Sequence, residues 1–122
     1  MLEEFMARGA RIRGVERRTS RFKRGHTDAL WFGTREIAHT HNGQVDVRLT
    51  RAGVRDLRDE LRSDARIDLR GPGFDWILIR VRNAADVKRA VELLRYAMRA
   101  AGGTVTASRG SAARRRARTR QR

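Results

Sequence analysis

Two histidines and an aspartate lie close together in one short segment of the chain. His39 and His41 are separated by one residue, Asn42-Gly43 follows directly, and Asp46 comes three residues later. Imidazole and carboxylate groups are well suited to proton transfer and to binding divalent metals. The segment is therefore the first place to look for chemistry, provided that the chain folds so that these side chains meet.

The Asn42-Gly43 pair indicates how they meet. Asn-Gly between two alternating apolar and polar runs is the strongest short signal for a β-hairpin, because both residues tolerate the positive φ angles of a type I′ turn. A two-residue turn also fixes the register and pairs His39 with Asp46. The other predicted pairs are His41 with Gln44, Thr40 with Val45, Ala38 with Val47, and Ile37 with Arg48.

In this register the hairpin has one apolar and one polar face. The apolar face is predicted to carry Ala38, Val45, Val47 and Leu49, and the polar face Arg35, His39, His41, Gln44, Asp46 and Arg48. Paired side chains on neighbouring strands lie about 4.5 to 5.5 Å apart, so His39 and Asp46 are expected to meet without help from any other element.

Three roles remain open for this cluster. Two imidazoles and one carboxylate have the composition of an open metal site, although we assign no residue as a metal ligand. Alternatively, Asp46 orients the His39 ring for acid–base chemistry or ligand binding. The third role is structural, a His–Asp hydrogen bond on a solvent-facing strand.

The segments around the hairpin predict an α+β fold. Strands are expected near residues 15–23, 29–32, 35–41 and 44–49 and again at 65–70 and 75–82. Amphipathic helices are expected after Thr50, which is the predicted N-cap, and from Asn83. We expect an antiparallel sheet of about five to six strands, with two main helices packed on one face. Residues 1–28 are an N-terminal helical turn and basic lead-in strand, 29–103 the main domain, and 104–122 a disordered basic tail.

The net charge of +15 is concentrated at the C-terminus. Residues 109–122 contain seven arginines and no acid. Such a segment could neutralise nucleic-acid phosphates without reading bases, and deleting residues 104–122 should then abolish binding. The arginines that we assign to nucleic-acid or other polyanion binding are Arg114, Arg115, Arg116, Arg118, Arg120 and Arg122.

Several classes of protein are disfavoured by the same sequence. The chain has no cysteine, which removes disulfides and thiolate metal sites, and it lacks a Gly-rich phosphate loop and a zinc-finger pattern. No run approaches the roughly 18 apolar residues of a membrane span, so we expect a cytoplasmic protein without a membrane partner.

The segments "FGTREIAHTHNGQVDVRL" and "FDWILIRVRNAADVKRAVELLRYAM" resemble the small bacterial luciferase-domain family, most of whose members are uncharacterised. The resemblance covers roughly residues 29–99 and does not include the tail. By position it marks Glu36, His39, His41, Asp46, Trp76 and Tyr96. The register places Glu36 on the apolar face, where it must sit at the sheet rim or pair with an arginine such as Arg80, because a buried unpaired carboxylate is too costly.

The sequence thus predicts a luciferase-domain-like protein with a candidate ligand or acid–base site at Glu36, His39, His41 and Asp46. The alternative is an accessory protein that binds nucleic acid non-specifically through its basic surface and tail. Neither hypothesis identifies a cofactor, a small-molecule ligand, a reaction or an oligomeric state.

Overall fold

The computed structural model describes residues 1–21, 28–69 and 74–102, apart from the side chain of His41. The six arginines assigned to polyanion binding therefore lie outside the described residues. The helices are α1 (Leu2–Ala10), α2 (Thr50–Asp56), α3 (Arg58–Arg62) and α4 (Ala84–Ala100). The strands are β1 (Val15–Thr19), β2 (Asp28–Phe32), β3 (Arg35–His41), β4 (Gln44–Arg48), β5 (Ile67–Leu69) and β6 (Trp76–Arg80).

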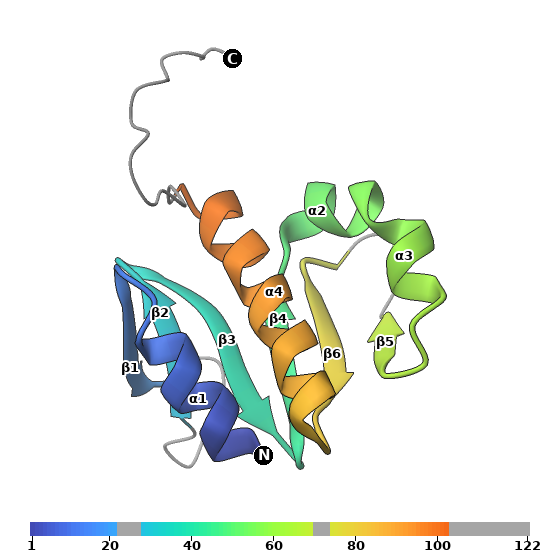
Figure 1. Cartoon of the computed structure of the whole chain (residues 1–122). Coiled ribbons are helices and arrows are strands. Elements are labelled where there is room, and N and C mark those ends of the chain that lie inside the picture. Colours follow the sequence, from blue (N-terminus) through green and yellow to red (C-terminus); the bar gives the residue numbers. More distant parts are fainter. Residues whose placement is uncertain (22–27, 70–73, 103–122) are drawn as a thin grey trace.

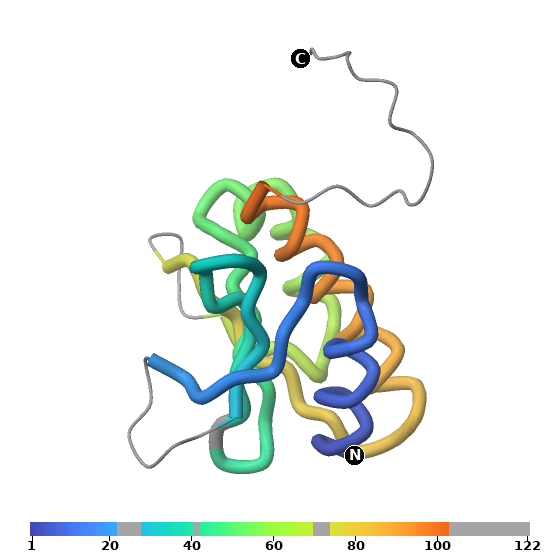
Figure 2. Tube along the Cα trace, turned by 90° about the vertical axis from the view of Figure 1, so that its left-hand side faces the viewer, coloured from blue at the N-terminus to red at the C-terminus, as the bar shows by residue number. Residues whose placement is uncertain are grey.

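The six strands form one antiparallel sheet in the order β1-β2-β3-β4-β6-β5. Helices α1 and α4 lie on the same side of it (Figures 1 and 2), and α2 and α3 lie beside the end that carries β5 and β6 (Figure 1). The predicted α+β class and the strand number are confirmed. No helix in the described part of the chain is long and apolar enough to cross a membrane.

Helix α4 forms where its sequence predicts. The Asn83 side chain accepts a hydrogen bond from the backbone N–H of Asp86 at 2.9 Å, which caps the first turn. One stripe of the helix is buried against the sheet, through Val87, Ala90, Val91, Leu93, Leu94, Ala97 and Met98. Burial of each large side chain in this stripe contributes about 1.5 to 3 kcal/mol.

The other predicted helix is interrupted at Leu57, whose φ and ψ of −101° and 12° separate α2 from α3. Its start has the predicted cap, since the Thr50 hydroxyl accepts a hydrogen bond from the Gly53 N–H at 3.2 Å. Thr50 itself has a φ of 72°, a left-handed conformation that is unfavourable for a β-branched residue. The N-terminal helical turns are present as α1, which adds Phe5 and Met6 to the core.

The hairpin of β3 and β4 has the predicted turn and register. Asn42 and Gly43 have φ angles of 50° and 78°, and the pairs run from His41–Gln44 to Ala38–Val47. Val45, Val47 and Ala38 are fully buried on the helix side of the sheet. The ladder stops one pair short of the predicted Ile37–Arg48 pair, because β3 is irregular at Ile37.

This irregularity is a β-bulge between β2 and β3. Leu30 pairs with Ala38, but the next residue of β2, Trp31, pairs with Glu36, so Ile37 is an extra residue in β3. Ile37 and Ala38 are both fully buried members of the core. The extra residue shifts the alternation of side chains between the two faces of the sheet by one position. The residues of β3 before Ile37 therefore lie on the opposite face from the one they would have in a regular strand.

Candidate functional site

The bulge places Glu36 beside His39. Our prediction that Glu36 lies on the apolar face, at the rim or paired with Arg80, is wrong, because it assumed regular alternation through Ile37. Glu36 Oε2 is 2.7 Å from His39 Nδ1, and the Glu36 side chain is completely buried. Arg80 instead pairs with Asp68 at 3.8 Å and donates to the Ala65 carbonyl.

A line of short hydrogen bonds runs from Ser20, directly after β1, through Glu36 and His39 of β3 to Asp46 of β4. The Ser20 hydroxyl donates to Glu36 Oε2 at 2.6 Å, and the Arg21 backbone N–H donates to Glu36 Oε1 at 2.7 Å. On the far side of the imidazole, His39 Nε2 lies 2.8 Å from Asp46 Oδ2. Glu36, His39 and Asp46 are each at most 3% exposed, so solvent screens these contacts little.

The two contacts of His39 fix how many hydrogens lie between the ring and the carboxyl oxygens that face it. Each of the two nitrogen–oxygen contacts of His39 needs one hydrogen between its atoms. Either the ring is an imidazolium between two carboxylates, or it is neutral and one of the acids is protonated. Both arrangements have one net negative charge, and they differ only in the position of a proton within the trio.

Two buried polar atoms at the Asp46 end of this line have no hydrogen-bond partner in the described part of the chain. They are Asp46 Oδ1 and Arg48 Nε. Asp46 and Arg48 alternate along β4, so their side chains lie on the same face of the sheet. The Trp76 ring lies next to them: its centroid is 4.7 Å from that of His39 and 5.9 Å from the Arg48 guanidinium.

The structure brings together three of the four predicted site residues, Glu36, His39 and Asp46. His41 pairs with Gln44 through its backbone, and its side chain lies outside the described residues. Trp76 contacts the His39 ring, whereas Tyr96 lies on α4, where it packs against Gly53 of α2. Ser20 and Arg21 are not predicted from the sequence, since nothing local to the end of β1 indicates that it lies beside Glu36.

Both ring nitrogens of His39 face carboxylates, which leaves neither of them directed at a metal ion. Among the described residues, no group of three or more histidine, aspartate or glutamate side chains is arranged to hold a metal. The arrangement is instead suited to holding and moving protons, because each member can exchange a proton with its neighbour along a preformed hydrogen bond.

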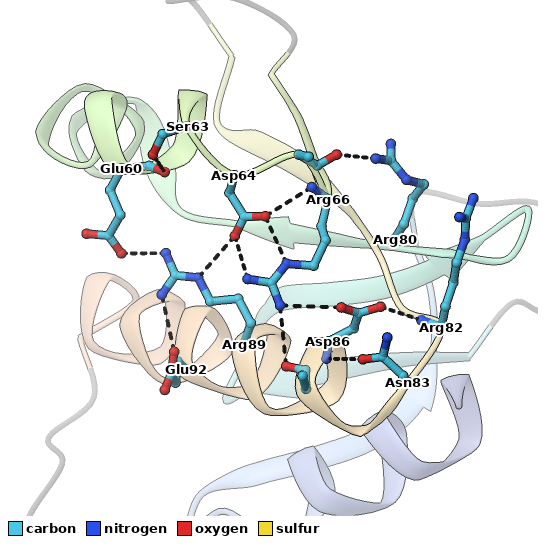
Figure 3. A network of polar contacts seen from close by, with 12 residues as sticks. Glu60, Ser63, Asp64, Arg66, Arg80, Arg82, Asn83, Asp86, Arg89 and Glu92 are labelled. Atoms are coloured by element: carbon cyan, nitrogen blue, oxygen red, sulfur yellow. Dashed lines mark hydrogen bonds and ion pairs between the residues drawn. The ribbon is translucent and has the colours of Figure 1, made fainter.

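A second polar cluster joins α3, β5 and α4 (Figure 3). Asp64 accepts from Arg66 at 2.8 Å, and Arg89 lies between Asp64, Glu60 and Glu92. The Arg66 guanidinium holds the pKa of the Asp64 carboxyl below its usual range. These residues line a shallow depression of about 460 Å³, but each charge in it has a partner, so we interpret the cluster as a tie between elements.

The fold and the trio define a small α+β domain with a buried carboxylate–imidazole–carboxylate line on the sheet face away from α1 and α4. Comparison with protein-family models matches residues 34–97 to the luciferase domain. The chain therefore belongs to the luciferase-domain family, as the resemblance of its sequence predicts. No curated protein matches the chain. No solved structure matches it either.

Proposed function

We propose that the sheet face around Glu36, His39 and Asp46 is an acid–base site that binds a small polar molecule and exchanges a proton with it. The observation that carries this proposal is the buried Asp46 Oδ1, which has no hydrogen-bond partner among the described residues. A buried carboxylate oxygen left unpaired costs free energy, so a purely structural network would be expected to satisfy it.

The line of hydrogen bonds assigns a role to each residue. Ser20 and the Arg21 backbone hold Glu36, and Glu36 fixes the orientation of the His39 ring through Nδ1. When Asp46 takes a proton from the bound molecule at Oδ1, His39 accepts the proton from Asp46 Oδ2; in the reverse direction His39 returns a proton to Oδ2 as Oδ1 donates its own to the molecule. This order parallels the logic of a catalytic triad, in which a buried acid orients a histidine that acts on a third group.

The same geometry indicates what the molecule must offer. Asp46 Oδ1 needs a hydrogen-bond donor, and Arg48 Nε, on the same face, needs an acceptor. A compound with both groups satisfies two buried atoms at once, and Trp76 provides an apolar ring beside them. Small organic acids, alcohols and amides meet these requirements.

The test compares the wild-type chain with Asp46→Asn, which keeps the size of the side chain and removes its acid–base capacity. Asp68→Asn is a matched control, because Asp68 lies in the same row of the sheet, two strands away, and its side chain is 65% exposed. Thermal shifts are measured for a panel of such compounds, and compounds that bind are incubated in D2O and followed by 1H NMR.

We expect selected compounds to stabilise the wild type and Asp68→Asn by about 2.7 kcal/mol at 100 times Kd. Asp46→Asn should bind them more weakly and should not catalyse deuterium exchange or turnover. Equal binding and equal exchange by Asp46→Asn and the wild type would refute the proposal.

A second candidate function, nucleic-acid binding through the C-terminal segment, is favoured by its seven arginines and absence of acids in residues 109–122. Guanidinium groups bind phosphate in a bidentate manner and stay charged at any physiological pH. Its test is the salt dependence of DNA binding by the full chain before and after Arg114, Arg115, Arg116, Arg118, Arg120 and Arg122 are replaced by glutamine.

A further inference from the structure

The sheet face around Glu36, His39 and Asp46 holds a buried negative charge. In both arrangements of its protons, this trio has one net negative charge. Within the described residues, neither of its two carboxyls forms an ion pair with an arginine or a lysine. A buried charge without a counter-ion is costly. A molecule that binds at this place is therefore expected to bring a positive charge with it.

Asp46 Oδ1 is the atom that can receive that charge. The two oxygens of Glu36 accept hydrogen bonds from Ser20 and from the Arg21 backbone, and Asp46 Oδ2 faces the His39 ring. Oδ1 is the one carboxyl oxygen of the trio that has no hydrogen-bond partner within the described residues. An ammonium group is both a hydrogen-bond donor and a cation, so it satisfies this oxygen and balances the charge at once. A hydroxyl or amide donor satisfies only the oxygen.

Arg48, two residues further along β4, offers the opposite charge. Nε and Nη2 form one edge of its planar guanidinium, and such an edge matches the two oxygens of a carboxylate. Nε is buried without a partner, and Nη2 donates to Asp75 Oδ2 only at 3.4 Å. A carboxylate on a bound molecule could take the place of Asp75 and accept two shorter hydrogen bonds from the same edge.

The two half-satisfied groups lie around the same tryptophan. Asp46 and Arg48 are on one face of β4, and Arg48 is directly opposite Trp76 of β6. The centroid of the Trp76 ring is 5.9 Å from the Arg48 guanidinium and 4.7 Å from the centroid of the His39 ring. Alternate residues of a strand are about 6.6 Å apart, and a hydrogen bond of about 2.9 Å at each end takes up most of that spacing. The donor and the acceptor of the ligand are therefore expected on neighbouring atoms.

The pair of Arg48 and Asp75 is the part of this site that solvent reaches. The Asp46 side chain is only 4% exposed, whereas those of Arg48 and Asp75 are 24% and 37% exposed. An ion pair that is this exposed and has a contact of 3.4 Å contributes little to stability. A ligand can therefore separate the two side chains at little cost and reach Asp46 between them.

We propose that this site binds free amino acids as zwitterions, with the ammonium group on Asp46 Oδ1 and the carboxylate on Arg48. The inference rests on the proposed acid–base site and names its substrate class. An α-amino acid carries its two charged groups on one carbon atom, which agrees with the short spacing of Asp46 and Arg48. Its side chain then lies beside Trp76, which favours an apolar side chain. Asp75 is a competitor of the ligand, because its carboxylate must leave Arg48 when the ligand binds.

The first test varies the ligand and uses only the wild-type full chain, so it does not depend on how well a variant folds. Binding of glycine, L-alanine, L-leucine and L-phenylalanine is measured by isothermal titration calorimetry at pH 7. Each is compared with its amide, which removes the carboxylate charge, and with its 2-hydroxy acid, which replaces the ammonium group. We expect at least one amino acid to bind, and its amide and hydroxy acid each to bind about tenfold to a hundredfold more weakly.

The second test assigns each ligand group to its residue. Arg48→Gln should no longer distinguish the amino acid from its amide, and Asp46→Asn should no longer distinguish it from its hydroxy acid. Asp75→Asn should bind the amino acid more tightly, by up to about fivefold, because the competing carboxylate is gone. Arg80→Gln is the control and should bind like the wild type, since Arg80 lies on the same sheet face and is 33% exposed but pairs with Asp68. Near-ultraviolet circular dichroism verifies that each variant is folded.

Different outcomes separate this inference from the proposed function. If none of the four amino acids binds, or if an amide or a hydroxy acid binds as tightly as its amino acid, the zwitterion is refuted. The acid–base site then still stands when other compounds bind the wild type and are exchanged by it but not by Asp46→Asn. Weaker binding by Asp75→Asn, or an equal loss in Arg80→Gln and Arg48→Gln, would refute the role of Arg48. If an amino acid binds the wild type and Asp46→Asn equally and both exchange it equally, both proposals fail.

Discussion

Replacing His39 by leucine should strongly destabilise the protein, because the imidazole lies between two buried carboxyls and contacts both of them. Its nitrogens lie 2.7 Å from Glu36 and 2.8 Å from Asp46, and both acids are nearly inaccessible to solvent. A hydrogen bond to a charged group contributes about 1.5 to 3 kcal/mol, so two of them amount to roughly 3 to 6 kcal/mol. Breaking a buried ion pair costs a similar amount, about 3 to 5 kcal/mol.

The measurement is urea unfolding at pH 7, followed by tryptophan fluorescence. With an m-value of about 2 kcal/mol/M, a loss of about 4 kcal/mol lowers the unfolding midpoint by about 2 M. Trp76 reports on the site itself, because its ring lies against His39. A loss below about 1 kcal/mol, the range of exposed ion pairs, would refute the reasoning.

A double-mutant cycle with Glu36→Gln tests whether the trio acts as a unit. Residues that share one hydrogen-bond network have coupling energies of about 0.5 to 3 kcal/mol. The combined variant Glu36→Gln/His39→Leu should therefore be less destabilised than the sum of the two single variants. Additive effects would mean that the short contact between Glu36 and His39 contributes no specific free energy.

Two further predictions concern other parts of the fold. Thr50→Asn should raise the free energy of unfolding by about 1 kcal/mol, because asparagine tolerates the left-handed conformation and can still accept the hydrogen bond from the Gly53 N–H. Thr50→Val removes that acceptor and should lower the free energy of unfolding. An unchanged thermal midpoint for Thr50→Asn would show that the backbone at Thr50 is not strained. The pKa of Asp64 is lowered, first by its hydrogen bond to Arg66. Its carboxylate therefore stabilises the fold fully when the pH is above the ordinary pKa of 3.8, and this stability is lost as the pH falls through the lowered pKa of the folded state. Asp64→Asn should therefore be less stable than the wild type at pH 7 and should lose less stability on acidification to pH about 2. Chemical denaturation at each pH measures this, with Asp59→Asn as the exposed control. If the free energy of unfolding of Asp64→Asn changed with pH in parallel with that of the wild type, the prediction would be wrong.

Much of the fold could be predicted from local signals. The Asn42-Gly43 turn fixed the hairpin register, and Asn83 marked the start of α4 by a cap that the structure contains. These features depend on residues that are near each other in the sequence. The break at Leu57 could not be predicted in this way, because the pattern of apolar residues continues through it.

The candidate site was predictable only in part, for a similar reason. The contact of His39 with Asp46 follows from the turn alone, whereas that of Glu36 with His39 depends on how β2 pairs with β3. Ser20 and Arg21 reach Glu36 only because β1 lies on the other side of β2. No pattern within a single segment contains that information.

The bulge at Ile37 has a consequence for comparing and engineering members of this family. In a regular strand, residues three apart point in opposite directions, so a Glu-x-x-His spacing would suggest a helix. Here the Glu-x-x-His spacing occurs in a strand, and it brings the two side chains to the same face only because of the extra residue Ile37. Deleting Ile37 from the chain, or grafting Glu36, His39 and Asp46 onto an unbulged sheet, would leave all three side chains in the protein and dismantle their line of hydrogen bonds. The number of residues between the acid and the histidine is thus as much a part of the site as the side chains themselves.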